Sequence, residues 1–174
     1  DARSALAAPD GLGTEEVEDL MRRRENKLLP DDPRLLPPGD RERVLDVPAD
    51  VYVCAAVSGS LTEERLDRLQ ASGVEVIASG ANHPFRELRL GSTRVAQRAD
   101  RRFAILADIL ANCGMARTFS YLMEEDALPH ADSIFDAVDR TIDNTLDEVL
   151  DRSGGATGLL AATLGLGLDR VGAP

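Results

Sequence analysis

The segment FAILADILANCGMARTFSYLM, residues 103–123, holds two different apolar patterns. Phe103–Ala107 is a continuous apolar run with the length of a buried strand. After Gly114 the apolar residues recur at helical spacing, at Met115, Phe119, Leu122 and Met123. Asp108–Cys113, between the two patterns, contains an acid, an asparagine and small residues. The segment therefore predicts a strand, a short polar loop and a helix.

The polar residues of this loop have two interpretations. In open α/β sheets, ligands bind just outside the carboxyl ends of the strands, which is where Asp108 and Asn112 are expected. Asparagine is also a favoured helix N-cap, and Asn112 stands where the cap of the following helix belongs. The pattern alone leaves both a ligand contact and a structural cap open.

A second segment, VEVIASGANHPF at residues 74–85, repeats the arrangement of strand, asparagine and turn. Together with the apolar run at Val51–Ala55, it gives three short strands. We expect Val51–Ala55, Val74–Ala78 and Phe103–Leu106 to be parallel neighbours, since the segments between them are long enough for the crossovers that parallel pairing requires. Their loops then share one edge of an α/β sheet.

The remaining elements are mostly helical. Helices are predicted at Thr14–Asn26, Asp132–Arg152 and Ala156–Val171. Leu28–Asp46 contains four prolines and is predicted to be an irregular connection.

Composition excludes several classes of function. The chain has 174 residues, 43% of them apolar, and a net charge of −11, so a nucleic-acid-binding surface is not expected. The longest apolar run, Leu159–Leu168, is too short and glycine-rich to span a bilayer. Cys54 and Cys113 are lone thiols, and no secretory signal is seen, which favours the cytoplasm. His83 and His130 are isolated, so no metal site is predicted.

Three segments, in this order, resemble the glutamate/leucine/phenylalanine/valine dehydrogenase family. Cys54-Ala55-Ala56 is similar to the family's P-A-A or P-C-A turn. Gly80-Ala81-Asn82-His83-Pro84 resembles its G-A-N-x-P segment. Residues 108–114, DILANCG, resemble its P-D-x-x-x-N-A-G-G segment.

The resemblance implies a Rossmann-like parallel sheet with three α/β/α layers, followed by C-terminal helices. Residues 1–128 would be a partial dinucleotide-binding domain, and residues 129–174 helices that pack on it or toward a substrate domain. Members of the family oxidatively deaminate an L-amino acid to a 2-oxo acid and ammonia, and use NAD or NADP. The resemblance also implies a parent enzyme, of which this chain would be a part. The parent would be a homo-oligomer that acts on a small-molecule substrate and has no nucleic acid or membrane partner.

The family's contacts carry over to four positions of the matching segments. Asn112 would hydrogen-bond the nicotinamide carboxamide or the substrate, and Asn82 the nicotinamide ribose. Ala55 and Ala56 would line the adenosine side.

Four further positions bear on the cofactor and substrate sites. Asp1 matches the end of the family's second strand, where an acid binds the adenosine ribose and favours NAD; it is otherwise a terminal residue without a role. Phe119 replaces a substrate-contacting serine of glutamate-specific members, and Ser120 is one residue further on. Glutamate is therefore a doubtful substrate, and Ser120 is the candidate substrate contact. Met115 departs from the family's second glycine.

Two features expected of a complete enzyme have no counterpart in the sequence. Gly11-Leu12-Gly13 and Gly165-Leu166-Gly167 both lack the third glycine of the G-x-G-x-x-G phosphate turn. The family's catalytic lysine and aspartate lie in another domain, and the single lysine here, Lys27, is expected to be exposed. We therefore predict a C-terminal part of the cofactor domain that contains no catalytic residue and is not competent alone. The alternative is a truncated, non-catalytic α/β module that acts in binding or oligomer contacts.

Overall fold

The computed structural model describes residues 3–172, which divide into two compact units. The first unit comprises the chain up to Asp50 together with Glu64–Val74. The second comprises Val51–Glu63 and the chain from Glu75 onward. All three of the family-like segments lie in the second unit.

The first unit contains short elements that the sequence did not predict. Strands β1 (Ala5–Leu6) and β2 (Leu35–Leu36) pair antiparallel, and a 3₁₀ helix, η1, follows at Pro38–Asp46. The prediction of an irregular connection over this region is therefore wrong in part. Proline has a fixed φ that suits the first turn of a helix, and Pro38 begins η1. The unit also contains the α-helix α1 (Thr14–Arg23) and nearly all of α2 (Glu63–Ala71).

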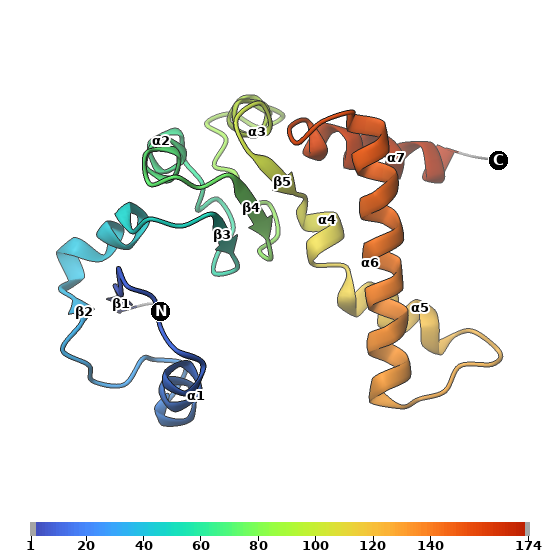
Figure 1. The fold of residues 1–174 in the computed structure, drawn as a ribbon. Coiled ribbons are helices and arrows are strands. Elements are labelled where there is room, and N and C mark those ends of the chain that lie inside the picture. The colour runs from blue at the N-terminus through green and yellow to red at the C-terminus, as the bar shows by residue number, and fades with distance from the viewer. Residues whose placement is uncertain (1–2, 173–174) are drawn as a thin grey trace. The chain divides into compact units, whose positions relative to one another are not determined.

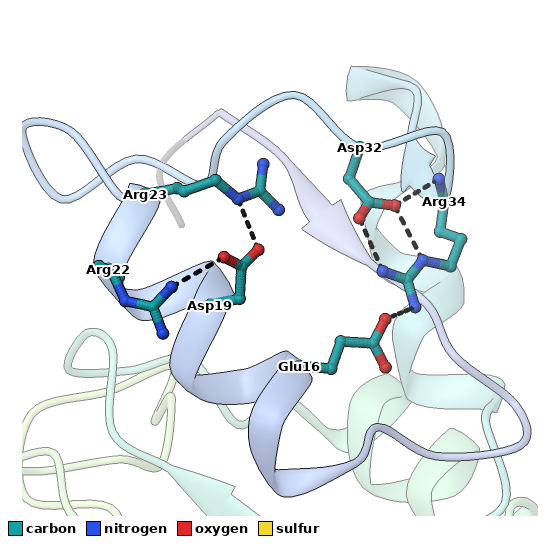
Figure 2. A network of polar contacts seen from close by, with 6 residues as sticks. All are labelled: Glu16, Asp19, Arg22, Arg23, Asp32 and Arg34. Atoms are coloured by element: carbon teal, nitrogen blue, oxygen red, sulfur yellow. Dashed lines mark hydrogen bonds and ion pairs between the residues drawn. The ribbon is translucent and has the colours of Figure 1, made fainter.

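An ion-pair network joins α1 to the loop before β2 (Figure 2). The Arg34 guanidinium donates to both carboxylate oxygens of Asp32 at 2.8 and 2.7 Å, and its backbone N–H donates to the same group at 2.9 Å. Arg34 also contacts Glu16 of α1 at 2.5 Å. Hydrogen bonds from the guanidinium, and then from the backbone N–H, lower the pKa of Asp32 from 3.8 to about 2.

This network predicts an acid-sensitive contribution to stability. Because the pKa of Asp32 is lower in the folded chain, its contribution is complete above pH 3.8 and is lost as the pH falls toward about 2. Carboxyl NMR titration should give a midpoint of about 2 for Asp32, and Arg34→Ala should return it toward 3.8. Arg22→Ala, which removes an exposed pair with Asp19, should leave the midpoint unchanged. A midpoint near 3.8 in the unsubstituted protein would contradict the network.

The second unit contains the predicted parallel sheet (Figure 1). Its strands are β3 (Val51–Cys54), β4 (Val76–Ser79) and β5 (Ala104–Leu106), hydrogen-bonded in that order and all parallel. Ile77 stands in register with Tyr52 on one side and with Ile105 on the other. The prediction of three parallel neighbours in an α/β fold is confirmed.

Alternation along the strands divides the sheet into two faces. Ile77 and Ile105 share one face and are fully buried. Ala104 lies on the other face and packs against a cluster of Val149, Leu159 and Ala162. These three residues come from α6 (Ala131–Ser153) and α7 (Leu159–Gly172), so the C-terminal helices form a core with β5.

The two C-terminal helices agree with the prediction from sequence, but the segment that follows β5 does not. α6 and α7 confirm the predicted helices, and Gly154, in the left-handed conformation, ends α6. The remaining helices are α3 (Arg94–Asp100), α4 (Asp108–Ala111) and α5 (Gly114–Leu122). α4 occupies the segment predicted as a loop, so this prediction is wrong: the chain makes one helical turn between β5 and α5 (Figure 1).

No helix in the described part of the chain is long and apolar enough to cross a membrane.

Candidate functional site

Three connecting segments leave the sheet at the same edge, because β3, β4 and β5 are parallel. We call them the β3 loop (residues 55–60), the β4 loop (residues 80–85) and the β5 turn (residues 107–113). They contain the three family-like segments except for Cys54, at the end of β3, and Gly114, at the start of α5. Each is joined to a neighbour by a hydrogen bond, so the edge is one connected structure.

The β3 and β4 loops approach each other closely at a glycine. The N–H of Ala81 donates to the carbonyl of Cys54 at 2.8 Å. A Cβ atom placed on Gly80 would lie 3.1 Å from the Cβ of Ala55, so a larger residue here would force the loops apart. Ala55 and Ala56 are both exposed, as residues that line a ligand surface must be.

The two asparagines predicted as ligand contacts meet between the β4 loop and the β5 turn. Asn112 Nδ2 donates to Asn82 Oδ1 at 2.9 Å, across 30 positions of sequence. Both residues are exposed, and within residues 3–172 their side chains have no further hydrogen-bond partner. The pair therefore presents unused N–H groups from Asn82 and an unused carbonyl oxygen from Asn112.

Asn112 is not the N-cap that one interpretation of the sequence predicted. The residue at the N-cap of α5 is Cys113, and Asn112 is the C-cap of α4, where its backbone N–H donates to the Asp108 carbonyl. Its side chain points instead to the β4 loop through Asn82. The extra helical turn of α4 explains the difference, since it moves the start of α5 one residue further along.

His83 joins all three segments through its backbone, and sequence reasoning missed this. Its N–H donates to Asp108 Oδ2 at 2.9 Å, and its carbonyl accepts the N–H of Gly59 at 2.8 Å. The φ angle of His83 is +47°, in the left-handed region. No sequence signal indicated this conformation, because a residue before proline normally prefers extended backbone.

The other predicted positions are not brought to the asparagine pair by hydrogen bonds. Ser120 is exposed on α5, and among the described residues no hydrogen bond links its side chain to either asparagine. Met115 and Phe119 are also exposed on α5, at 70% and 62%. Asp1, predicted to bind the adenosine ribose, lies outside the described residues. Within residues 3–172 no cluster of three or more metal-ligating side chains occurs.

The fold and the loop edge define an α/β protein with a parallel sheet whose three strand-end segments are fastened together. The chain belongs to the glutamate/leucine/phenylalanine/valine dehydrogenase family, whose model matches residues 1–153. The family assignment made from the three sequence segments is therefore confirmed.

One relative resembles the chain in sequence, and two solved structures resemble it in fold. The chain is 30% identical over 116 residues to a glutamate dehydrogenase of Aeropyrum pernix, covering 66% of this chain and 25% of that protein. Its fold is similar to Plasmodium falciparum glutamate dehydrogenase, with a TM-score of 0.64, 15% identity, and coverage of 98% of this chain and 38% of that one. L-tryptophan dehydrogenase from Nostoc punctiforme gives a TM-score of 0.52 and 19% identity, covering 78% of this chain and 38% of that one. The chain thus spans between a quarter and two fifths of the length of these relatives.

Proposed function

We propose that this chain is the C-terminal, cofactor-binding part of an NAD(P)-dependent amino acid dehydrogenase. The observation that carries the proposal is the hydrogen bond between Asn112 and Asn82, which joins two family-like segments at the carboxyl edge of the sheet. Membership of the family supports the same conclusion. The parent enzyme would oxidatively deaminate an L-amino acid to a 2-oxo acid and ammonia.

The residues at this edge suit a nicotinamide cofactor in shape and in hydrogen bonding. The close approach at Gly80 leaves Ala55 and Ala56 as a surface of small side chains for the adenosine side. Asn112 has a carbonyl oxygen free to accept from a carboxamide, and Asn82 has N–H groups free for a ribose hydroxyl. A bound nicotinamide would supply the hydride acceptor, and Asn82 and Asn112 would hold its ring in a fixed orientation.

The finer assignments extend the same proposal. Residues 1–128 would form the partial dinucleotide-binding domain, and residues 129–174 the helices that pack on it or face a substrate domain. NAD is favoured over NADP through Asp1, and Ser120 is the candidate substrate contact. With Phe119 in place of a serine, glutamate is disfavoured as the amino acid. We place the parent in the cytoplasm as a homo-oligomer.

We expect the chain by itself to show no amino acid dehydrogenase turnover. It has no G-x-G-x-x-G turn, and Lys27, its single lysine, is exposed rather than pocketed. The complete protein should reduce NAD⁺ or NADP⁺ with at least one L-amino acid, measured by the absorbance of the reduced nicotinamide. Turnover by the purified 174-residue chain would contradict the proposed role as a part of the enzyme.

The alternative is a non-catalytic α/β module that acts in binding or oligomer contacts, which the missing glycine turn favours. Titration of the complete protein with NADH, followed by fluorescence, separates the two. Saturable binding that is weakened by Asn112→Asp supports the cofactor site. A protein that binds no NADH and turns over no amino acid would support the module instead.

A further inference from the structure

We propose that Asp108 is a positioning residue, which orients Asn82 toward the cofactor by holding the backbone of His83. The contact is a hydrogen bond of 2.9 Å from the His83 N–H to Asp108 Oδ2. The inference rests on the proposed function, because it assigns a role within the same site. Asp108 itself touches no cofactor in this role and acts through its neighbour.

The backbone that Asp108 holds is one that His83 would not adopt unaided. A non-glycine residue with a φ of +47° is uncommon, and Pro84 immediately after it disfavours helical backbone further. Such a conformation persists only where surrounding contacts determine it. Two contacts do so here: Asp108 binds the N–H of His83, and Gly59 binds its carbonyl.

The same helical turn fixes both the backbone and the side chain of the β4 loop. Asp108 begins α4 and Asn112 follows it as the C-cap, and the Asn112 N–H donates to the Asp108 carbonyl at 2.9 Å. One end of this turn binds the backbone of His83, and the other binds the side chain of Asn82. Two contacts at adjacent residues determine both where Asn82 lies and which way its amide faces. Without Asp108, the peptide between Asn82 and His83 loses the hydrogen bond that fixes its orientation.

The first measurement needs no catalysis. In the complete protein, Asp108→Ala should speed hydrogen exchange of the His83 amide at least ~10-fold, as loss of a bond to a charged acceptor predicts. Asp108→Asn keeps an acceptor oxygen and should change exchange less than ~3-fold. Asp143→Ala, at an exposed position on α6, is the matched control and should change nothing. Unchanged exchange in Asp108→Ala would overturn the proposal.

The second measurement asks whether Asp108 acts through Asn82. With the amino acid that the unsubstituted protein oxidises fastest, Asp108→Ala should lower kcat/KM ~10-fold, mainly through the KM for the cofactor. In an Asn82→Ala background, the same change should cost less than ~2-fold, because the two residues act as one unit. Equal losses in both backgrounds would show that Asp108 acts independently of Asn82 and would overturn the proposal.

Glycine at position 83 supplies a rescue. His83→Gly removes the penalty of positive φ, so the double variant with Asp108→Ala should recover more than half of the lost kcat/KM on a logarithmic scale. It also covers the case in which Asp108→Ala alone fails to fold; a double variant that still failed to fold would overturn the proposal. If the unsubstituted protein neither binds NADH nor turns over, the proposed function fails, while the exchange experiment still decides whether Asp108 holds His83.

Discussion

Replacing Asn112 with aspartate in the complete protein should lower kcat/KM at least ~10-fold, as expected for the loss of one hydrogen bond that positions the groups facing a reacting ligand. Asn112 Nδ2 is the donor in the bond to Asn82. A carboxylate offers acceptors and a charge but no N–H. The substitution therefore breaks the link between the two loops, because it places a charged oxygen beside Asn82 Oδ1. It also replaces the neutral carbonyl that would accept from the nicotinamide carboxamide with a charged group. Because the side chain is exposed, thermal unfolding should change little.

Asn82→Asp is the matched comparison, since it makes the same chemical change in the partner residue. A carboxylate at position 82 can still accept from Asn112 Nδ2, and its second oxygen, which replaces the free N–H groups of Asn82, can accept from a ribose hydroxyl, since a hydroxyl donates as well as accepts. We therefore expect a loss of less than ~3-fold, so that the two isosteric changes differ in effect. Steady-state kinetics of both variants measures this. If Asn112→Asp turns over like the unsubstituted enzyme, the cofactor contact assigned to Asn112 is wrong.

The sheet was predictable from sequence because its strands are apolar runs bounded by turn residues. Val76–Ser79 and Ala104–Leu106 differ from the predicted strands by only one or two residues at their ends. The pairs at Ala5–Leu6 and Leu35–Leu36 were not predictable, since two residues are too few for any periodicity. The helical turn of α4 was missed for the same reason: four residues give no repeat of the helical pattern.

The positions of the two asparagines at the strand ends were predictable from sequence, but the connection between them was not. Asn82 and Asn112 were found because both follow a strand within a recognisable segment. The hydrogen bond between them depends on the exact direction of two side chains, which sequence pattern does not contain. The conformation of His83 was not predictable either. Asp108 and Gly59, which lie 25 and 24 positions away in the sequence, bind its backbone and override its preference for an extended conformation. Tertiary contacts of this kind can be seen only in the folded chain.

Within the sheet-bearing unit, a buried aspartate of α3 binds the start of the C-terminal helix. Asp100 is the last residue of α3 and is only 7% exposed. Its carboxylate accepts the backbone N–H groups of Leu160 and Ala161 at 2.8 and 3.1 Å, and its carbonyl accepts that of Gly158 at 2.9 Å. These N–H groups belong to the start of α7, where helices have unsatisfied donors and a positive end of the dipole. Asp100 thus caps a helix that begins about 60 positions later in the chain.

Asp100→Ala should therefore lower the free energy of unfolding by ~2–4 kcal/mol, because the buried N–H of Leu160 and the part-buried N–H of Ala161 lose their carboxylate acceptor. Asp100→Asn keeps the shape of the side chain but only one acceptor oxygen. Its free energy of unfolding should lie between those of the unsubstituted protein and Asp100→Ala. The matched control is Asp169→Ala in α7, which breaks an exposed ion pair with Arg152 and should cost less than ~1 kcal/mol. Urea unfolding followed by circular dichroism measures all three, and hydrogen exchange should show faster exchange of the Leu160 and Ala161 amides in Asp100→Ala. Equal costs for the substitutions at 100 and 169 would mean that Asp100 does not anchor α7.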